Sequence, residues 1–201
     1  NKHQPRALNN MQIHVSQVDA IVENDHPLPE LPPVQLDEKS IIIGNLIAEQ
    51  IADGSCIQLG IGAIPDATGA ALMVKHDLGI HTEMFTSSMV DLIACGAVNN
   101  SKKQIHPGKT VTTFAYGSQK IYDFINDNPA IEILPVEYVN DPNVICQNDN
   151  MISINAAPST CPVPAVRWTM SAVPASPRAA RALSPSPLPQ RTIPSARLSP
   201  F

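Results

Sequence analysis

A strand, a glycine turn and a helix follow one another between residues 56 and 66. The apolar run from Cys56 to Leu59 leads into Gly60-Ile61-Gly62, and Pro65 and Asp66 come soon after. An apolar run bounded by glycine is typical of a buried strand. Proline at the first position of a helix and an acid in its first turn are typical of a helix start. Units of a strand followed by a helix are typical of parallel sheets, so this one predicts an α/β fold.

The same alternation continues towards residue 155. Short apolar runs alternate with segments of helical periodicity. The predicted strands cover 79–81, 110–115, 131–134 and 151–155, and the predicted helices cover 87–95 and 118–126. Helices of this length between strands imply a largely parallel sheet flanked by helices.

Three further elements are predicted before residue 56. Two short strands cover 11–15 and 20–23, and the prolines of 26–33 form a stiff connector. Asp37 is suited to cap a helix over 38–53, and Gly54 is suited to end it. Apolar residues at helical spacing support this helix, namely Ile43, Leu46, Ile47 and Ile51.

Charge is unevenly distributed along the chain. Residues 1–157 hold all 18 acidic residues and 8 of the 13 basic ones, a formal charge of −10, and the remainder carries +5. Binding to nucleic acid requires clustered Lys and Arg, and the pair Lys102-Lys103 is too short for that. We therefore expect no nucleic-acid partner.

The cysteines and the hydropathy indicate a cytoplasmic protein. Cys56, Cys95, Cys146 and Cys161 are widely spaced and form no Cys-x-x-Cys pair, as expected of reduced thiols. No run reaches about 18 apolar residues and no signal-peptide pattern opens the chain, so no membrane span is expected.

The composition changes at Pro158. Ten of the 20 prolines fall in the last 44 residues, among Ser, Ala and Arg, and the periodicity stops. This composition predicts a disordered tail over 158–201. Because the chain also begins at Asn1 without a Met, we expect both ends to be cut.

Glu83 stands 21 residues after Gly62, just beyond the predicted strand 79–81. In parallel α/β sheets, ligands bind beyond the carboxyl ends of the strands, and both the glycine loop and Glu83 follow such ends. A carboxylate that faces a loop of backbone N–H groups suits covalent catalysis on an activated acyl group. The carboxylate attacks, and the N–H groups stabilise the oxyanion.

Other interpretations of these residues stay open. The glycine loop could be a tight turn without a ligand, or a dinucleotide site, although that site would require glycine where Pro65 stands. His81 and Glu83 could bind a metal as His-x-Glu, but a convincing third ligand is lacking, and His81 is expected to pack or hydrogen-bond beside the site. The run 138–142 is expected to form a structural turn.

Four strings of the sequence resemble the acetyl-CoA hydrolase/transferase family, especially 4-hydroxybutyrate and butyrate:acetate CoA-transferases. They lie within residues 1–157, and the second and third are the specific ones. The strings are His26-Pro27-Leu28-Pro29-Glu30, then 57–67 around Gly60 and Gly62, then 78–84 around Glu83, and Tyr138-Val139-Asn140-Asp141-Pro142.

The resemblance implies a fold and a reaction. Family members have two α/β domains with the active site between them, so residues 1–36 would end the first domain and 37–157 would begin the second. Glu83 would become a glutamyl-CoA thioester, and Gln58, Leu59, Gly60, Ile61 and Gly62 would lie against coenzyme A and the oxyanion. Coenzyme A would be a substrate, the partners would be acyl-CoA and small carboxylic acids, and no metal or permanently bound cofactor would be required. The intact protein is expected to form a homo-oligomer.

Competing functions also follow from the same residues. An acyl-CoA hydrolase differs only in whether water reaches the intermediate, and a nucleotide-binding module would carry no chemistry. A third possibility is an inert remnant of a broken gene. We expect the tail to be translated out of frame, because permitted codons for 161–174, read one frame over, can encode a Gly-Gly-Gln loop that resembles the family's.

Overall fold

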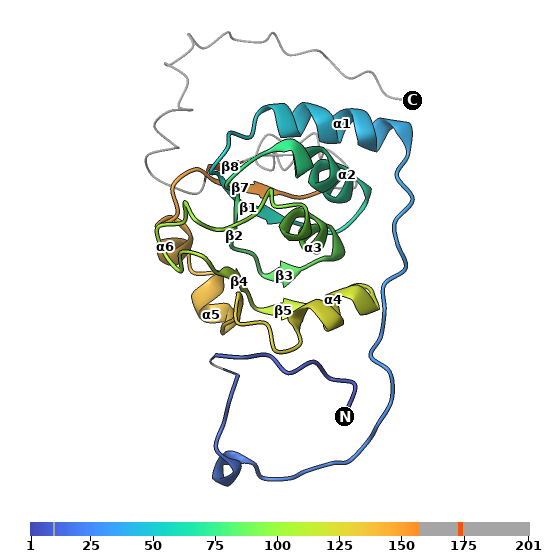
Figure 1. Ribbon diagram of the computed structural model, residues 1–201, viewed down its shortest axis with the longest axis vertical. Helices are drawn as coiled ribbons and strands as arrows, with labels where there is room; N and C mark the ends of the chain where they lie inside the picture. The colour runs from blue at the N-terminus through green and yellow to red at the C-terminus, as the bar shows by residue number, and fades with distance from the viewer. Residues whose placement is uncertain (10, 157–172, 175–201) are drawn as a thin grey trace, which may run out of the picture.

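The computed structural model describes residues 1–9 and 11–156 and the short strand β8, Val173–Pro174 (Figure 1). The predicted disorder of 158–201 otherwise lies outside the described residues. The strands are β1 Cys56–Leu59, β2 Gly79–Ile80, β3 Met84–Phe85, β4 Thr110–Thr112, β5 Phe114–Ala115, β6 Ile131–Ile133 and β7 Met151–Ile154. The helices are α1 Glu38–Glu49, α2 Ala63–Ala71, α3 Ser87–Ala94, α4 Gln119–Ile125, α5 Val136–Val139 and α6 Pro142–Ile145, with short 3₁₀ turns at Val15–Gln17 and Leu72–Val74.

The strands β1 to β7 run parallel, as the alternation predicts. β1 lies between β2 and β7, β3 pairs with β5, and β4 pairs with β6. A single-residue parallel bridge joins His81, just after β2, to Val111 in β4. The hydrogen-bonded sets are therefore β2-β1-β7-β8, β3-β5 and β4-β6, and the bridge joins the first set to the third. The strand β8 pairs antiparallel with β7.

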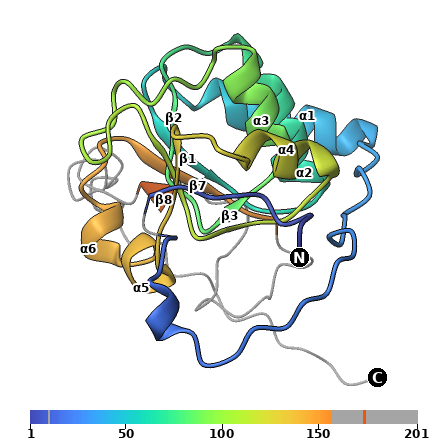
Figure 2. The same cartoon turned by 60° about the horizontal axis from the view of Figure 1, so that its bottom comes forward.

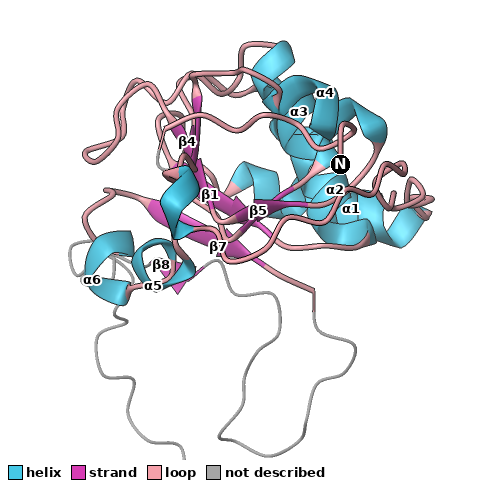
Figure 3. Ribbon diagram, turned by 90° about the horizontal axis from the view of Figure 1, so that it is seen from below, coloured by secondary structure: helices cyan, strands magenta, loops and turns pink. Residues whose placement is uncertain are grey.

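The helices α1 to α4 gather on one side of the strands, and α5 and α6 lie on the other (Figure 3). The main apolar core lies between the strands and the first group, and its members are nearly inaccessible to solvent; they include Ile57, Leu59, Ile80, Phe85 and Leu92. Burial of these side chains is the main driving force that holds the glycine turn and its neighbours in place.

Of the apolar residues at helical spacing in and just after α1, Ile51 is buried and Ile47 packs against the core, but Leu46 does not belong to the buried face. Ser40, Gly44 and Ala48 face the protein, whereas Leu46 is 56% exposed. The helices α1 and α2 approach so closely that a Cβ at Gly44 would lie 2.7 Å from the backbone carbon of Ala67. Small residues allow this approach, which is why the contact of α1 with α2 holds Gly44 rather than a larger apolar side chain. Asp37 caps the helix through Ser40 N at 2.9 Å, as predicted.

The predicted strands at 11–15 and 20–23 are wrong. This part of the chain holds only the short 3₁₀ turn Val15–Gln17, and it loops away from the body (blue in Figures 1 and 2). A strand requires a neighbour for its backbone hydrogen bonds, and the described residues provide none here. Apolar side chains of the segment are exposed, among them Ile13, Ile21 and Val22.

Several element boundaries also differ. The helix α1 ends at Glu49 rather than near 53, and Pro65 is the third residue of α2 rather than its first. The predicted strand 110–115 is divided into β4 and β5, which pair with different partners. No helix of the described part is long and apolar enough to cross a bilayer.

Candidate active site

The order of the strands places the carboxyl ends of β1, β2 and β7 side by side at one edge of the sheet. From β1 the chain continues to β2 on one side, and it returns to β7 on the other side. Ligands of α/β proteins bind beyond the carboxyl ends of such neighbouring parallel strands. The glycine loop after β1 and Asn155 after β7 both lie at this point.

Two glycines shape the loop after β1. The Gly62 backbone, at φ 115° and ψ 178°, is strained for any residue with a Cβ, and it opens α2 without offering a side-chain cap. The Gly60 N–H donates to the Ile154 carbonyl at 2.8 Å, and a Cβ at Gly60 would lie 2.5 Å from Asn155 Oδ1. The first N–H groups of α2 are thus available to an anionic group.

Gln58 belongs to a polar cluster with Ser153 and Asn155, which come from the neighbouring strand and its loop. Its Oε1 accepts from Asn155 Nδ2 at 3.1 Å and also from the Ser153 hydroxyl. Asn155 Nδ2 also donates to Ser153 Oγ at 2.9 Å. Sequence reasoning missed Ser153 and Asn155, because only the pairing of β7 with β1 brings them beside Gln58.

Leu59, the last residue of β1, and Ile61 in the glycine loop differ in their exposure to solvent. The Leu59 side chain is fully buried in the core, so only its backbone can reach a ligand, whereas Ile61 is 61% exposed. Beside Ile61 and Gly62 lies a cavity of about 1040 Å³, where the starts of α2, α3 and α4 meet the segment 31–36. Its lining is mostly apolar. Asp66 also lines it, and burial raises the pKa of this carboxyl.

The backbone of Glu83 is firmly held. Its carbonyl accepts hydrogen bonds from Thr113 N at 2.9 Å, Phe114 N at 3.1 Å and Thr112 Oγ1 at 2.9 Å. The side chain remains exposed, and its Oε2 accepts from Asn140 Nδ2 at 2.6 Å. A short, charge-assisted bond of this kind orients the carboxylate and leaves its other oxygen available for chemistry.

Asn140 is a functional candidate that the sequence did not reveal. It is the C-cap of α5, and the predicted turn over 138–142 lies where Asn140 and Asp141 join the end of α5 to the start of α6. Asp141 has the structural role that was predicted, since it caps α6 through Asn143 N at 2.8 Å. The polar residue next to it contacts the predicted nucleophile, and only the folded chain brings the two together across 57 positions.

His81 is buried beneath the site. It is 1% exposed, and its Nε2 donates to the Val139 carbonyl at 2.8 Å. Burial lowers the pKa of His81 to about 4, so the ring is neutral near pH 7. The prediction that His81 packs and hydrogen-bonds beside the site is confirmed. Within the described residues no group of three potential metal ligands comes together.

The structure therefore forms two polar groups at the carboxyl ends of neighbouring strands. One joins Glu83 to Asn140, and the other joins Gln58 to Ser153 and Asn155. No hydrogen bond joins the two groups among the described residues. The cavity beside the glycine loop is lined by Thr86, Ser87 and Ser88, which follow Glu83 closely in the chain.

Comparison with known proteins identifies the class. Residues 117–160 match the family model described as acetyl-CoA hydrolase/transferase C-terminal domain. The chain is 53% identical over 158 residues to succinyl-CoA:cyclohexane-1-carboxylate CoA transferase of Geobacter metallireducens. It is 51% identical over 156 residues to 4-hydroxybutyrate coenzyme A transferase of Clostridium kluyveri. Each match covers 78% of this chain and 36% of the relative.

Solved structures agree. A 4-hydroxybutyrate CoA-transferase from Porphyromonas gingivalis superposes with a TM-score of 0.72 at 46% identity, covering 77% of this chain and 39% of that one. RipA from Yersinia pestis gives a TM-score of 0.69 at 48% identity, covering 71% and 33%. The chain belongs to the acetyl-CoA hydrolase/transferase family, and it spans about a third of the length of these relatives.

Proposed function

We propose that this chain is part of a CoA-transferase in which Glu83 is the nucleophile. The observation that carries the proposal is the exposed Glu83 carboxylate, which Asn140 orients beyond the end of β2, the strand that pairs with the one leading into the glycine loop. The names of the relatives support the class of reaction, since each describes transfer of coenzyme A.

The proposed reaction proceeds by two exchanges. Glu83 attacks the carbonyl of an acyl-CoA, the C–S bond breaks, and a mixed anhydride and CoA thiolate form. The thiolate then attacks the glutamyl carbonyl, which releases the carboxylate product and leaves a glutamyl-CoA thioester. An acceptor carboxylate reverses these steps, takes the coenzyme A and restores Glu83. One thioester replaces another, so the chemistry requires neither a metal nor a resident cofactor.

Gln58 and the glycine loop have the complementary role in this proposal. The Gly60 N–H is bound to the Ile154 carbonyl, so the N–H groups that follow it in the glycine loop would stabilise the oxyanion. Each such donor contributes about 10²–10³ in rate. Asn155 fixes the Gln58 side chain at the same edge. The backbone of Leu59 and the exposed Ile61 would lie along coenzyme A, whose remote contacts supply the binding energy that positions the reacting atoms.

We further propose that residues 37–157 form the first half of the C-terminal domain and that 1–36 end the N-terminal one. The family model of the C-terminal domain matches 117–160, which supports the assignment of that part to the C-terminal domain. An active site between two domains is incomplete in this span, so residues 1–201 alone are expected to show no CoA transfer.

A chimera tests the proposed function. Residues 1–156 replace the matching segment of the Clostridium kluyveri relative, and transfer of CoA from butyryl-CoA to acetate is measured. Glu83→Gln should abolish transfer, because the amide is a poor nucleophile. Glu49→Gln, which neutralises an exposed carboxylate at the end of α1, is the matched control and should leave transfer intact. Undiminished turnover of the Glu83→Gln chimera would contradict the proposal, whereas release of CoA without acetate would indicate a hydrolase.

A further inference from the structure

Three consecutive residues at the end of α5 contact three side chains from elsewhere in the fold. The Tyr138 hydroxyl lies 2.8 Å from His106 Nε2, the Val139 carbonyl accepts from His81 at 2.8 Å, and Asn140 donates to Glu83 at 2.6 Å. The helix α5 has only four residues, Val136–Val139. A single helical turn is not stable by itself, so these contacts determine where it sits.

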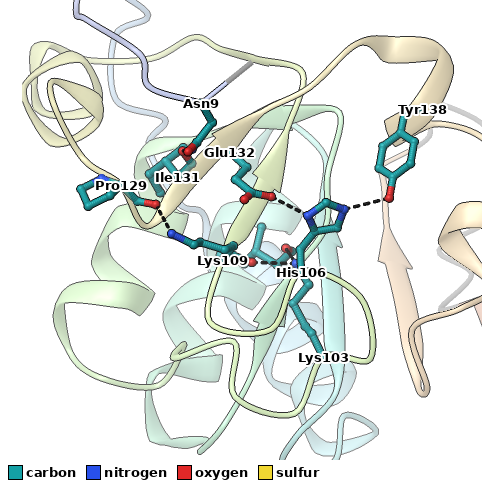
Figure 4. A network of polar contacts seen from close by, with 9 residues as sticks. Asn9, Lys103, His106, Lys109, Pro129, Ile131, Glu132 and Tyr138 are labelled. Carbon is teal, nitrogen blue, oxygen red and sulfur yellow. Dashed lines mark hydrogen bonds and ion pairs between the residues drawn. The ribbon is translucent and has the colours of Figure 1, made fainter. Parts of the chain in front are cut away.

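His106, which contacts Tyr138 through Nε2, also has a partner at its other ring nitrogen, Nδ1. Glu132 Oε2 on β6 lies 2.5 Å from His106 Nδ1, at ion-pair distance (Figure 4). The Tyr138 ring meets the imidazole edge-on, with centroids 5.6 Å apart and an interplanar angle of 84°. His106 thus joins β6 to α5 through both ring nitrogens.

The loop that carries His106 is attached to the strand that leads to Glu83. Asn100 Oδ1 accepts from Ile80 N at 2.8 Å, and buried Lys103 Nζ donates to the Ile80 carbonyl at 3.0 Å and to the Lys109 carbonyl at 2.7 Å. Both backbone groups of Ile80 are therefore bound by this loop, three positions before Glu83. His106 itself adopts φ +49°, a left-handed conformation that the rest of the loop must enforce.

The loop 99–110 thus connects the segment of the proposed nucleophile to the helix of its hydrogen-bond donor. We propose that His106 and Tyr138 are positioning residues, which hold α5 against this loop and so keep the Asn140 amide on the Glu83 carboxylate. The significance for catalysis rests on the proposed function of Glu83. The mechanical part does not, because it concerns only where α5 and Asn140 lie.

Hydrogen exchange and side-chain NMR of ¹⁵N-labelled residues 1–201 test this inference. Tyr138→Phe removes one hydroxyl and leaves the ring. The loss of one hydrogen bond should speed exchange of the Val139 and Asn140 backbone N–H groups about tenfold, since they hold α5 through Pro135 and Val136. The Asn140 side-chain amide signals should move towards those of the Glu83→Ala variant, where the acceptor is absent.

Tyr122→Phe is the matched control. Tyr122 lies in α4, and its hydroxyl donates to the Pro29 carbonyl at 2.6 Å, so the variant also loses one tyrosine hydrogen bond. It should leave hydrogen exchange in α5 and the Asn140 side-chain signals unchanged. Unchanged Asn140 signals in Tyr138→Phe would overturn the inference, and so would an equal response to Tyr122→Phe. If Tyr138→Phe does not fold, His106→Gln decides by the same two readouts. None of these outcomes depends on catalysis, so failure of the chimera assay remains distinguishable.

Discussion

Acidification should destabilise this fold through His81. The ring is buried and neutral, its Nε2 donates to the Val139 carbonyl, and its Nδ1 has no hydrogen-bond partner within the described residues. Burial lowers the pKa of His81 from 6.5 to about 4. Between these values the unfolded chain binds a proton that the folded chain does not, so stability falls as the pH falls through this window.

The magnitude follows from the two pKa values. Above about pH 6.5 the neutral ring contributes no pH dependence. Between about pH 7 and about pH 5 the difference in proton binding lowers the free energy of unfolding by about 2 kcal/mol. A change of this size is a substantial part of the stability of an ordinary domain.

Urea unfolding across this range measures the effect. Carboxylates also titrate towards the lower limit, so the comparison is with His81→Gln, whose amide can still donate to the Val139 carbonyl but does not titrate. We expect a clearly smaller loss of stability on acidification in His81→Gln. The control is His76→Gln, which makes the same change at a histidine whose side chain is 79% exposed and so measures the effect of the substitution outside the core. An identical pH dependence in wild type and His81→Gln would refute the reasoning.

Three further predictions concern the contact of α1 with α2, the glycine loop and the buried Lys103. Gly44→Ala should destabilise the chain by about 1–3 kcal/mol in urea unfolding, although alanine favours helices, because the new Cβ meets the α2 backbone at 2.7 Å; a stabilised variant would contradict this. Gly60→Ala should displace the Asn155 side chain, whose Oδ1 lies 2.5 Å from the new Cβ, and unmoved Asn155 amide signals in NMR would show the contact to be absent. Burial lowers the pKa of Lys103 to about 8, so stability should rise between about pH 8 and about pH 9 as the folded chain loses its proton first. Lys103→Met should remove that rise, and a rise that persists in the variant would assign it to another group.

The elements that the sequence predicted correctly are those whose signal is local. The strand, glycine turn and helix around Gly60 and Gly62 can be recognised from adjacent residues, and the order of the elements implied parallel strands. The strands at 11–15 and 20–23 failed because alternating apolar residues do not supply a partner strand. In α1, regular apolar spacing indicated Ile47 and Ile51 correctly but not Leu46, which is exposed. The close contact with α2 is made at Gly44, a small residue that apolar spacing does not identify.

The residues of the candidate site also fall into those that local sequence signals indicate and those that only the fold reveals. Glu83 and the glycine loop were predicted from their positions after strands, and the fold supports the adjacency of β1 and β2. Asn140 and Asn155 could not be found, because each reaches the site through contacts distant in sequence. The run 138–142 was expected to form a structural turn. Asp141 does have a structural role, as the cap of α6, but Asn140 before it contacts Glu83.

The covalent intermediate is the central claim, and mapping it is the most direct measurement. The chimera is incubated with butyryl-CoA without acceptor and then treated with hydroxylamine, which converts an enzyme thioester to a stable hydroxamate. Trypsin releases residues 76–102, whose carboxyl side chains are Asp77, Glu83 and Asp91. We predict that peptide mass spectrometry will place the hydroxamate on Glu83, with both aspartates unmodified. A hydroxamate on either aspartate, or none on Glu83 in an active chimera, would contradict the account.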